Sequence, residues 1–188
     1  MCIRDSIPTT HGEKVVIRLL TSGGKALELK DLGFDEPMMA ILERSYTKPY
    51  GMIISSGPTG SGKTTTLYSM LKLVNSRERN ILTIEDPVEY SIDGVNHIQV
   101  NSKAKLTFAT GLRALLRQDP NIIMIGEIRD KETAQIAINA AMTCLLYTSD
   151  AADDLLCVDL GGRRIIKKQK KNKTTYTLIT TLSTNNTS

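Results

Sequence analysis

The run GPTGSGKT at residues 57–64 constrains this chain most, because it fits the pattern G-x-x-x-x-G-K-[ST] at every fixed position. Its glycines allow a tight turn in which successive backbone amides converge on phosphate oxygens. Lys63 adds a positive charge, the Thr64 hydroxyl can bind Mg²⁺, and the following helix directs its positive dipole end at the same anion. The run predicts a nucleoside triphosphate site. The residues expected to line it are Gly57, Pro58, Thr59, Gly60, Ser61, Gly62, Lys63, Thr64 and Thr65.

The segments around this run predict an α/β fold. Residues 51–56, GMIISS, are typical of a buried strand, and residues 65–74 carry apolar side chains at helical spacing. Further strands are predicted at 13–20, 80–84, 95–100 and 121–126, the third as an edge strand, and further helices at 36–48, 107–118 and 131–142. Strands that alternate with helices imply a parallel sheet covered on both faces, with ligands at the carboxyl ends of its strands.

Composition and charge argue against a nucleic-acid surface. The 188 residues carry a formal charge of +4. Residues 144–188 contain seven basic and four acidic groups, and the other 143 residues contain 17 basic and 16 acidic groups. The basic run at 163–173 is more typical of a solvated tail than of a binding site. Aromatic residues, at 4%, are too sparse for an obvious base-stacking platform.

Other functional classes have little support in the sequence. Cys2, Cys144 and Cys157 have no metal-ligand spacing, and His11 and His97 stand far apart. No apolar stretch approaches the ~20 residues that span a bilayer, and no apolar core follows the opening MCIRDS. The expected location is the cytosol.

Carboxylates follow two of the predicted core strands. Glu85, Asp86 and Glu89 come after the strand at 80–84, and Glu127 comes after the strand at 121–126. In a parallel sheet these ends lie beside the phosphate loop, where carboxylates can hold metal-bound water or orient a nucleophile. The alternative is that they are helix caps or surface acids. Thr64, Glu85 and Glu127 are the candidates for holding Mg²⁺, and Lys63 joins the glutamates as a catalytic candidate.

An arginine is also expected, because negative charge develops on a transferred phosphoryl group. The candidates are Arg18, Arg113, Arg117 and Arg129. Each of them could equally be part of a surface ion pair.

Several segments together resemble the motor ATPases of type II secretion and type IV pilus assembly. The resemblance extends over about residues 7–143 and rests on HGEKVVIRLL, LELKDLGF, GPTGSGKTTTLY, TIEDPVEY and GLRALLRQDPNIIMIGEIRD. It implies a P-loop NTPase with a RecA-like core, ATP and Mg²⁺ as ligands, and a hexameric ring. It also implies a cytoplasmic location at the inner membrane, with a platform protein as partner and coupling of hydrolysis to movement of pilin-like subunits.

The resemblance also implies roles for individual positions. Residues 57–64 would be the Walker A loop, Glu85, Asp86 and Glu89 the acidic box, and Glu127 an atypical Walker B glutamate that a glycine normally precedes. Arg18 would be a charge-stabilising arginine from the end of a preceding domain.

The resemblance stops after Thr143, where CLLYTSDAADD replaces the expected Gly-His, buried strand and histidine box. We interpret MCIRDS and CLLYTSDAADD as products of sequencing-adapter read-through. The expected organisation is therefore residues 1–24 as the end of an N-terminal domain with a linker, 25–143 as an ATPase core truncated at its C-terminus, and 144–188 as an artefactual or disordered tail. No histidine follows His97, and the four-cysteine zinc module of many relatives is missing.

Three functions compete at this stage. The first is a secretion or pilus motor that hydrolyses ATP. The second is a RecA-like nucleic-acid translocase, against which the near-neutral motif region argues. The third is a nucleotide-binding fragment without turnover, because the last active-site segment is absent.

Overall fold

The computed structural model describes residues 2–18, 28–58, 60–150, 165–170 and 173–178, with side chains described for 7–15, 28–58 and 60–148. At the N-terminal end, β1 (Cys2–Thr9) pairs antiparallel with β2 (Gly12–Arg18) in a separate two-stranded sheet. The predicted strand at 13–20 corresponds to β2. Residues 19–27, which the sequence assigned in part to a linker, lie outside the described part of the chain.

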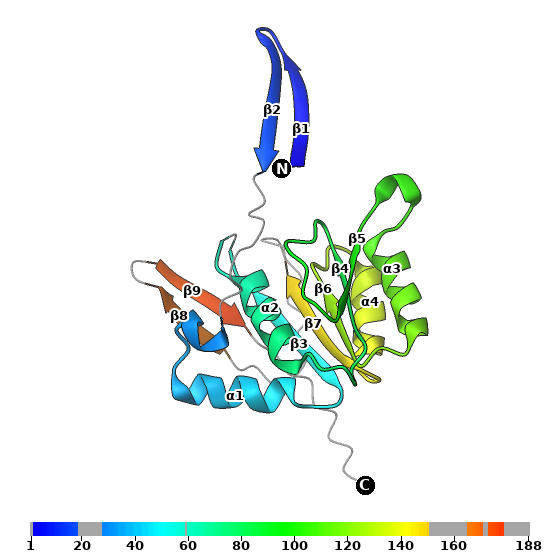
Figure 1. The fold of residues 1–188 in the computed structure, drawn as a ribbon. Helices are drawn as coiled ribbons and strands as arrows, with labels where there is room; N and C mark the ends of the chain where they lie inside the picture. The colour runs from blue at the N-terminus through cyan, green and yellow to red at the C-terminus, as the bar shows by residue number, and fades with distance from the viewer. Residues whose placement is uncertain (1, 19–27, 59, 151–164, 171–172, 179–188) are drawn as a thin grey trace.

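The main sheet has the strand order β5-β4-β6-β7-β3-β9-β8 (Figure 1). Five neighbouring strands are parallel: β5 (Val95–Gln99), β4 (Ile81–Glu85), β6 (Ile122–Ile125), β7 (Leu145–Asp150) and β3 (Gly51–Ser56). The hairpin of β8 (Ile165–Lys170) and β9 (Lys173–Leu178) extends this sheet antiparallel to β3. The predicted parallel α/β sheet is confirmed.

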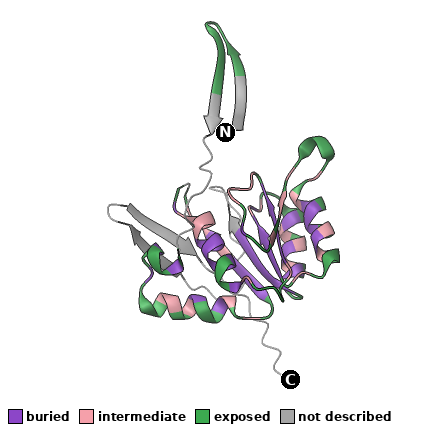
Figure 2. Cartoon of the chain, in the orientation of Figure 1, coloured by how far each residue is buried: buried purple, intermediate pink, exposed green. Residues whose placement is uncertain are grey.

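Helices cover both faces of the sheet (Figure 1). The strands alternate their side chains between these two faces. On one face α1 (Glu36–Tyr46) and α2 (Lys63–Val74) pack on Ile53, Ile81 and Tyr147. On the other face α3 (Phe108–Leu115) and α4 (Lys131–Ala140) pack on Met52, Ile84 and Ile123. The sheet therefore lies between two apolar layers, in which the inner strands β4 and β6 are buried along their length and the edge strand β5 is only partly buried (Figure 2).

Local capping explains where the helices begin. The Asp35 carboxylate accepts a hydrogen bond from the Met38 amide at 2.9 Å, and Asp130 accepts one from Thr133 at 2.7 Å. Thr107 and Thr110 form a reciprocal capping box at the start of α3. The helix predicted at 107–118 divides at Leu115, where the 3₁₀ turn η3 (Leu116–Gln118) follows α3. Short 3₁₀ turns also occur at η1 (Leu29–Leu32) and η2 (Ser102–Ala104).

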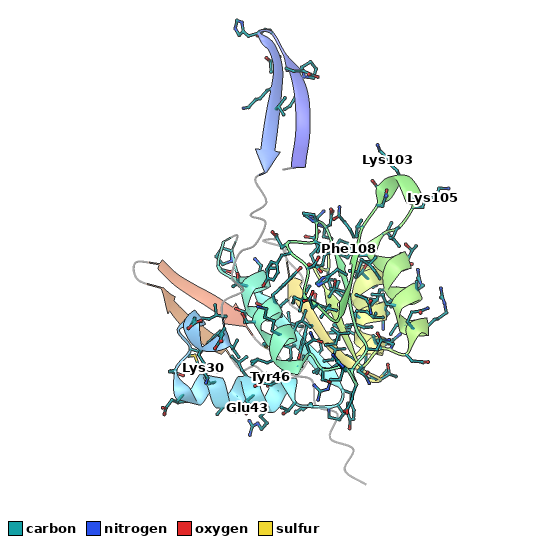
Figure 3. The ribbon with its side chains drawn as sticks, in the orientation of Figure 1. Lys30, Glu43, Tyr46, Lys103, Lys105 and Phe108 are labelled. Atoms are coloured by element: carbon teal, nitrogen blue, oxygen red, sulfur yellow. The ribbon has the colours of Figure 1, made fainter. Side chains whose placement is uncertain are left out.

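Strand β5 lies at the edge of the sheet, as its alternating sequence predicted. It is followed by a projecting turn that contains η2 and the exposed residues Lys103 and Lys105 (Figure 3). A bridge between Asn101 and Leu106 closes the base of this turn. Exposed lysines beside an edge strand discourage pairing with another chain.

The C-terminal boundary differs from the sequence analysis, which ended the core at residue 143. Strand β7, Leu145–Asp150, lies in the sheet interior and pairs in parallel with both β3 and β6. Leu145, Leu146 and Tyr147 are at most 2% exposed. The sequence does not show this role clearly, because a four-residue apolar run is too short to separate a central strand from other buried segments. The segment CLLYTSD thus supplies a sheet strand that the resemblance had left missing.

This placement of β7 can be tested at the adjacent thiol. Burial raises the pKa of Cys144 to about 11, whereas Met142 two residues earlier is 60% exposed. In chains with Cys2 and Cys157 replaced by serine, we expect a thiol reagent at pH 8 to label Cys144 at least about 100-fold more slowly than the cysteine of a matched Cys144→Ser, Met142→Cys chain. Equal labelling rates before denaturation would contradict a buried β7.

Candidate nucleotide-binding site

The predicted phosphate loop connects β3 to α2 at the carboxyl end of the parallel sheet. Gly60 and Gly62 have φ angles of 76° and 91°, a backbone conformation that residues other than glycine rarely adopt. Gly62 is the N-cap residue of α2, so the first amides of the helix follow the loop directly. This arrangement suits an anion at the helix N-terminus. Pro58 is exposed, and Thr59 lies outside the described residues.

The Lys63 ammonium group lies against its own loop. Its Nζ donates a hydrogen bond to the Gly57 carbonyl and another, at 3.3 Å, to the Pro58 carbonyl. The positive charge is therefore held at the loop by neutral acceptors. A phosphate oxygen offers a stronger, charge-assisted hydrogen bond than a carbonyl does.

Hydroxyl groups are concentrated in and near the loop. Thr64 and Thr65 lie half-buried in the first turn of α2, and Thr66 donates to the Gly62 carbonyl at 2.9 Å. The buried hydroxyls of Ser55 and Ser61 have no hydrogen-bond partner among the described residues. A buried polar atom is normally satisfied by protein, water or ligand. These hydroxyls fit a site whose remaining partners come from a polar ligand.

Glu85, at the end of β4, is 2% exposed and is held by three side chains. Its Oε1 accepts hydrogen bonds from Thr83 Oγ1 at 2.5 Å and from His97 Nδ1 at 2.9 Å, and its Oε2 accepts one from the Tyr68 hydroxyl. Burial, followed by the bond to Glu85, raises the pKa of Tyr68, so the phenol remains a donor. Helix α2, which begins at the phosphate loop, is thereby joined to the carboxylate of β4.

Glu127 follows β6, is 8% exposed, and forms an ion pair with Arg129 at 2.7 Å. It lies next to the end of β4, because the Gly126 amide donates to the Ile84 carbonyl at 2.8 Å. A Cβ at Gly126 would approach Glu85 Cα to 3.2 Å and the Ile84 carbonyl oxygen to 3.3 Å. A glycine is needed here because two strand ends come close together. The backbones that carry Glu85 and Glu127 are thus in direct contact.

The other predicted acidic positions are less buried. Asp86 is exposed, and Glu89 is half-buried in the loop after β4. The Glu89 backbone lies beside the Tyr68 hydroxyl, and the Tyr90 ring lies 4.4 Å from the Tyr68 ring. Glu89 therefore belongs to the surroundings of Tyr68.

Only one candidate arginine is found at these carboxylates among the described side chains. Arg129 contacts Glu127, whereas Arg113 forms an exposed ion pair with Glu132 at 2.5 Å and Arg117 is exposed in η3. Arg18 ends β2, and its side chain lies outside the described set.

His97 and Tyr68 are the residues that sequence reasoning missed. His97 looked unaccompanied because the side chains it bonds, those of Thr83 and Glu85, lie 12 or more positions away in the chain. The alternation of side chains along a strand could have indicated this contact. Once β4 and β5 are paired, Thr83 lies opposite His97, and Thr83 and Glu85 lie on the same face of the sheet.

The described residues contain no cluster of three His, Cys, Asp or Glu side chains that could hold a metal by themselves. Mg²⁺ normally keeps several waters and binds substrate phosphates with only one or two protein groups. The donor set of Thr64 with nearby carboxylates is compatible with that mode.

Among the described helices, none has the length and apolar character needed to cross a membrane.

The fold and loop define the class of protein: an α/β P-loop NTPase. A family model described as "Type II/IV secretion system protein" matches residues 3–153. The chain belongs to this family. It is 55% identical over 144 residues to type II secretion system protein E of Aeromonas hydrophila, which covers 77% of the chain and 29% of that relative. It is 50% identical over 162 residues to the type IV pilus assembly ATPase PilB of Thermus thermophilus, which covers 84% of the chain and 18% of that relative.

Solved structures agree with this assignment. The pilus retraction motor PilT with bound ADP aligns with a TM-score of 0.69 at 27% identity, covering 94% of the chain and 58% of PilT. The ATPase DotB of Legionella pneumophila aligns with a TM-score of 0.65 at 27% identity, covering 80% of the chain and 43% of DotB. The chain spans less than a third of the length of the two sequence relatives described above.

The contact at Gly126 makes a specific stability prediction. In Gly126→Ala the new methyl group must displace backbone atoms of Ile84 and Glu85, and we expect the free energy of unfolding to fall by about 1–3 kcal/mol. Urea denaturation measures this change, with Ser91→Ala at an exposed position as the control. A loss no larger than that of the control would show that the two strand ends are not in close contact.

Proposed function

We propose that this chain is the nucleotide-binding core of a motor that hydrolyses ATP to power type II secretion or type IV pilus assembly. One observation carries the proposal: the phosphate loop lies at the same sheet edge as two buried glutamates, Glu85 and Glu127. Phosphoryl transfer needs positioning and electrostatic stabilisation more than covalent participation by the protein. The family membership supports the same activity.

The nucleotide phosphates would bind the loop from Gly57 to Thr65, with Lys63 moving from its loop carbonyls to the outer phosphates. Thr64 would hold Mg²⁺ together with phosphate oxygens and water, and Glu85 or Glu127 would reach the ion through water. When bound, Mg²⁺ would neutralise charge on the phosphates.

Glu127 and Glu85 are the proposed catalytic carboxylates, which orient the attacking water. Glu89 would contribute to the same acidic group. Arg129 holds Glu127 in the described structure, so the transition-state arginine would be Arg18 or an arginine of a neighbouring subunit.

The resemblance further supports a homo-hexamer in the cytoplasm, bound peripherally at the inner membrane to a platform protein. No nucleic-acid partner is proposed, because the region with recognisable motifs is nearly neutral. The alternative function is nucleotide binding without turnover. Measured turnover separates the two.

The first test concerns turnover. We expect Glu127→Gln to lower phosphate release by about 10²–10⁴-fold while ATP still binds, because the amide keeps the shape of the side chain but not its charge. Exposed Glu43→Gln on α1 is the matched control and should keep the wild-type rate. Equal rates in Glu127→Gln, Lys63→Ala and the wild-type chain would favour binding without turnover.

The second test concerns binding. Removing the Lys63 ammonium deletes a charge-assisted contact with the phosphates, so Lys63→Ala should weaken ATP binding at least about tenfold. Equilibrium dialysis with labelled ATP and Mg²⁺ measures it, with Lys72→Ala at an exposed position of the same helix as control. No ATP binding by the folded wild-type chain would end the motor proposal.

A further inference from the structure

The buried carboxylate of Glu85 is held by donors from three different elements. Tyr68 comes from α2, Thr83 from β4 itself and His97 from β5. Both carboxylate oxygens are therefore engaged, and Oε1 receives two bonds. The side-chain exposure of Glu85 and His97 is only 3% and 8%, so water competes little for these contacts.

The hydrogen bond on the far side of the imidazole determines which His97 nitrogen carries the proton. The backbone amide of Ile92 donates to His97 Nε2 at 3.1 Å, so Nε2 must be an acceptor. The proton of the neutral ring is therefore on Nδ1, which faces Glu85 Oε1. His97 thus works as a directed donor, with one nitrogen anchored to backbone and the other aimed at the carboxylate.

Packing fixes the plane of this ring as well. The His97 ring is stacked on the Tyr68 ring, with centroids 5.9 Å apart and planes 20° apart. Strand register places His97 opposite Thr83, whose Oγ1 lies 3.0 Å from His97 Nδ1. The imidazole is consequently restrained by a stacked ring, a backbone amide and a neighbouring hydroxyl. Because the ring cannot rotate freely, the hydrogen bond from its Nδ1 holds Glu85 Oε1 in one position.

We propose that His97 is a positioning residue that fixes the rotamer of the Glu85 carboxylate at the edge of the phosphate site. This inference rests on the proposed ATP hydrolysis, in which Glu85 must present an oxygen in a fixed direction. A carboxylate with a free rotamer would sample unproductive orientations, and small displacements of a catalytic group lower the rate strongly. His97 itself need not touch nucleotide.

The first experiment separates positioning from substrate binding. His97→Leu puts an apolar side chain in the place of the imidazole and removes both hydrogen bonds, and we expect kcat to fall about tenfold or more with KM within about twofold. Affinity for a non-hydrolysable ATP analogue should likewise change by less than about twofold. The exposed His11→Leu is the matched control and should behave like the wild-type chain. An unchanged kcat, or a fall in kcat that matches a loss of folded protein, would overturn the proposal.

The second experiment is rescue by a conservative variant. A glutamine amide carries an NH₂ donor and a carbonyl acceptor on the same carbon, so His97→Gln can offer a donor to Glu85 and an acceptor to the Ile92 amide. We expect kcat of His97→Gln to return to within about threefold of the wild-type value. A glutamine variant as slow as His97→Leu would argue that the hydrogen bonds are not what matters.

A double-mutant cycle then tests whether His97 acts through Glu85. Once Glu85→Gln has removed the carboxylate, adding His97→Leu should change kcat by less than about twofold. A purely structural histidine would instead produce the same further loss in both backgrounds.

An observation independent of turnover keeps this inference separate from the proposed function. The ¹⁵N shifts of the His97 ring should report a neutral imidazole protonated at Nδ1 in the folded chain without nucleotide. A ring protonated at Nε2 would overturn the positioning contact even if ATP is hydrolysed. Absence of Lys63-dependent phosphate release would defeat the hydrolysis proposal, and the ring tautomer would still decide whether His97 is placed to direct Glu85.

Discussion

The pairing of β7 with both β3 and β6 is the constraint on which the rest of this structure depends. Among the described strands, β7 alone joins the strand before the phosphate loop to the strand before Glu127. Hydrogen bonds between parallel strands fix the shift of one strand along the other as well as the distance between them. This pairing therefore places the phosphate loop and the Glu127 carboxylate at the same carboxyl end of the sheet. The apolar residues of β7 also close the two helical layers around it.

Close backbone approach turns that edge into a chemical site. Gly126 lets the end of β6 lie against β4, and the glutamates that follow or end these strands are both nearly buried. Burying a carboxylate costs free energy unless donors replace its water. Glu85 is satisfied by Tyr68, Thr83 and His97, and Glu127 by Arg129 at least in part. Because Tyr68 lies on α2, the phosphate loop helix and the acidic strand form one polar network.

Local sequence signals predicted most of the elements but not their boundaries. The strand at 51–56 and the start of the helix at residue 36 were correct, because apolar runs and apolar spacing act over a few residues. The helix predicted at 107–118 is an α-helix only as far as Leu115 and continues as a 3₁₀ turn, and β7 was assigned to the tail. A short apolar strand inside a parallel sheet has no period of its own, so only its neighbours identify it.

The sequence by itself determined the phosphate loop, the alternation of strands and helices, and the presence of acids after two core strands. These features are local, since glycine geometry, helix dipole and hydrophobic period need no distant partner. The tertiary structure alone decided that His97 and Tyr68 meet Glu85, that Arg129 rather than Arg113 pairs with Glu127, and that Cys144 is buried. The contacts of Glu85 with Tyr68 and His97 join residues from separate elements, and only the register and packing of the sheet bring such residues together.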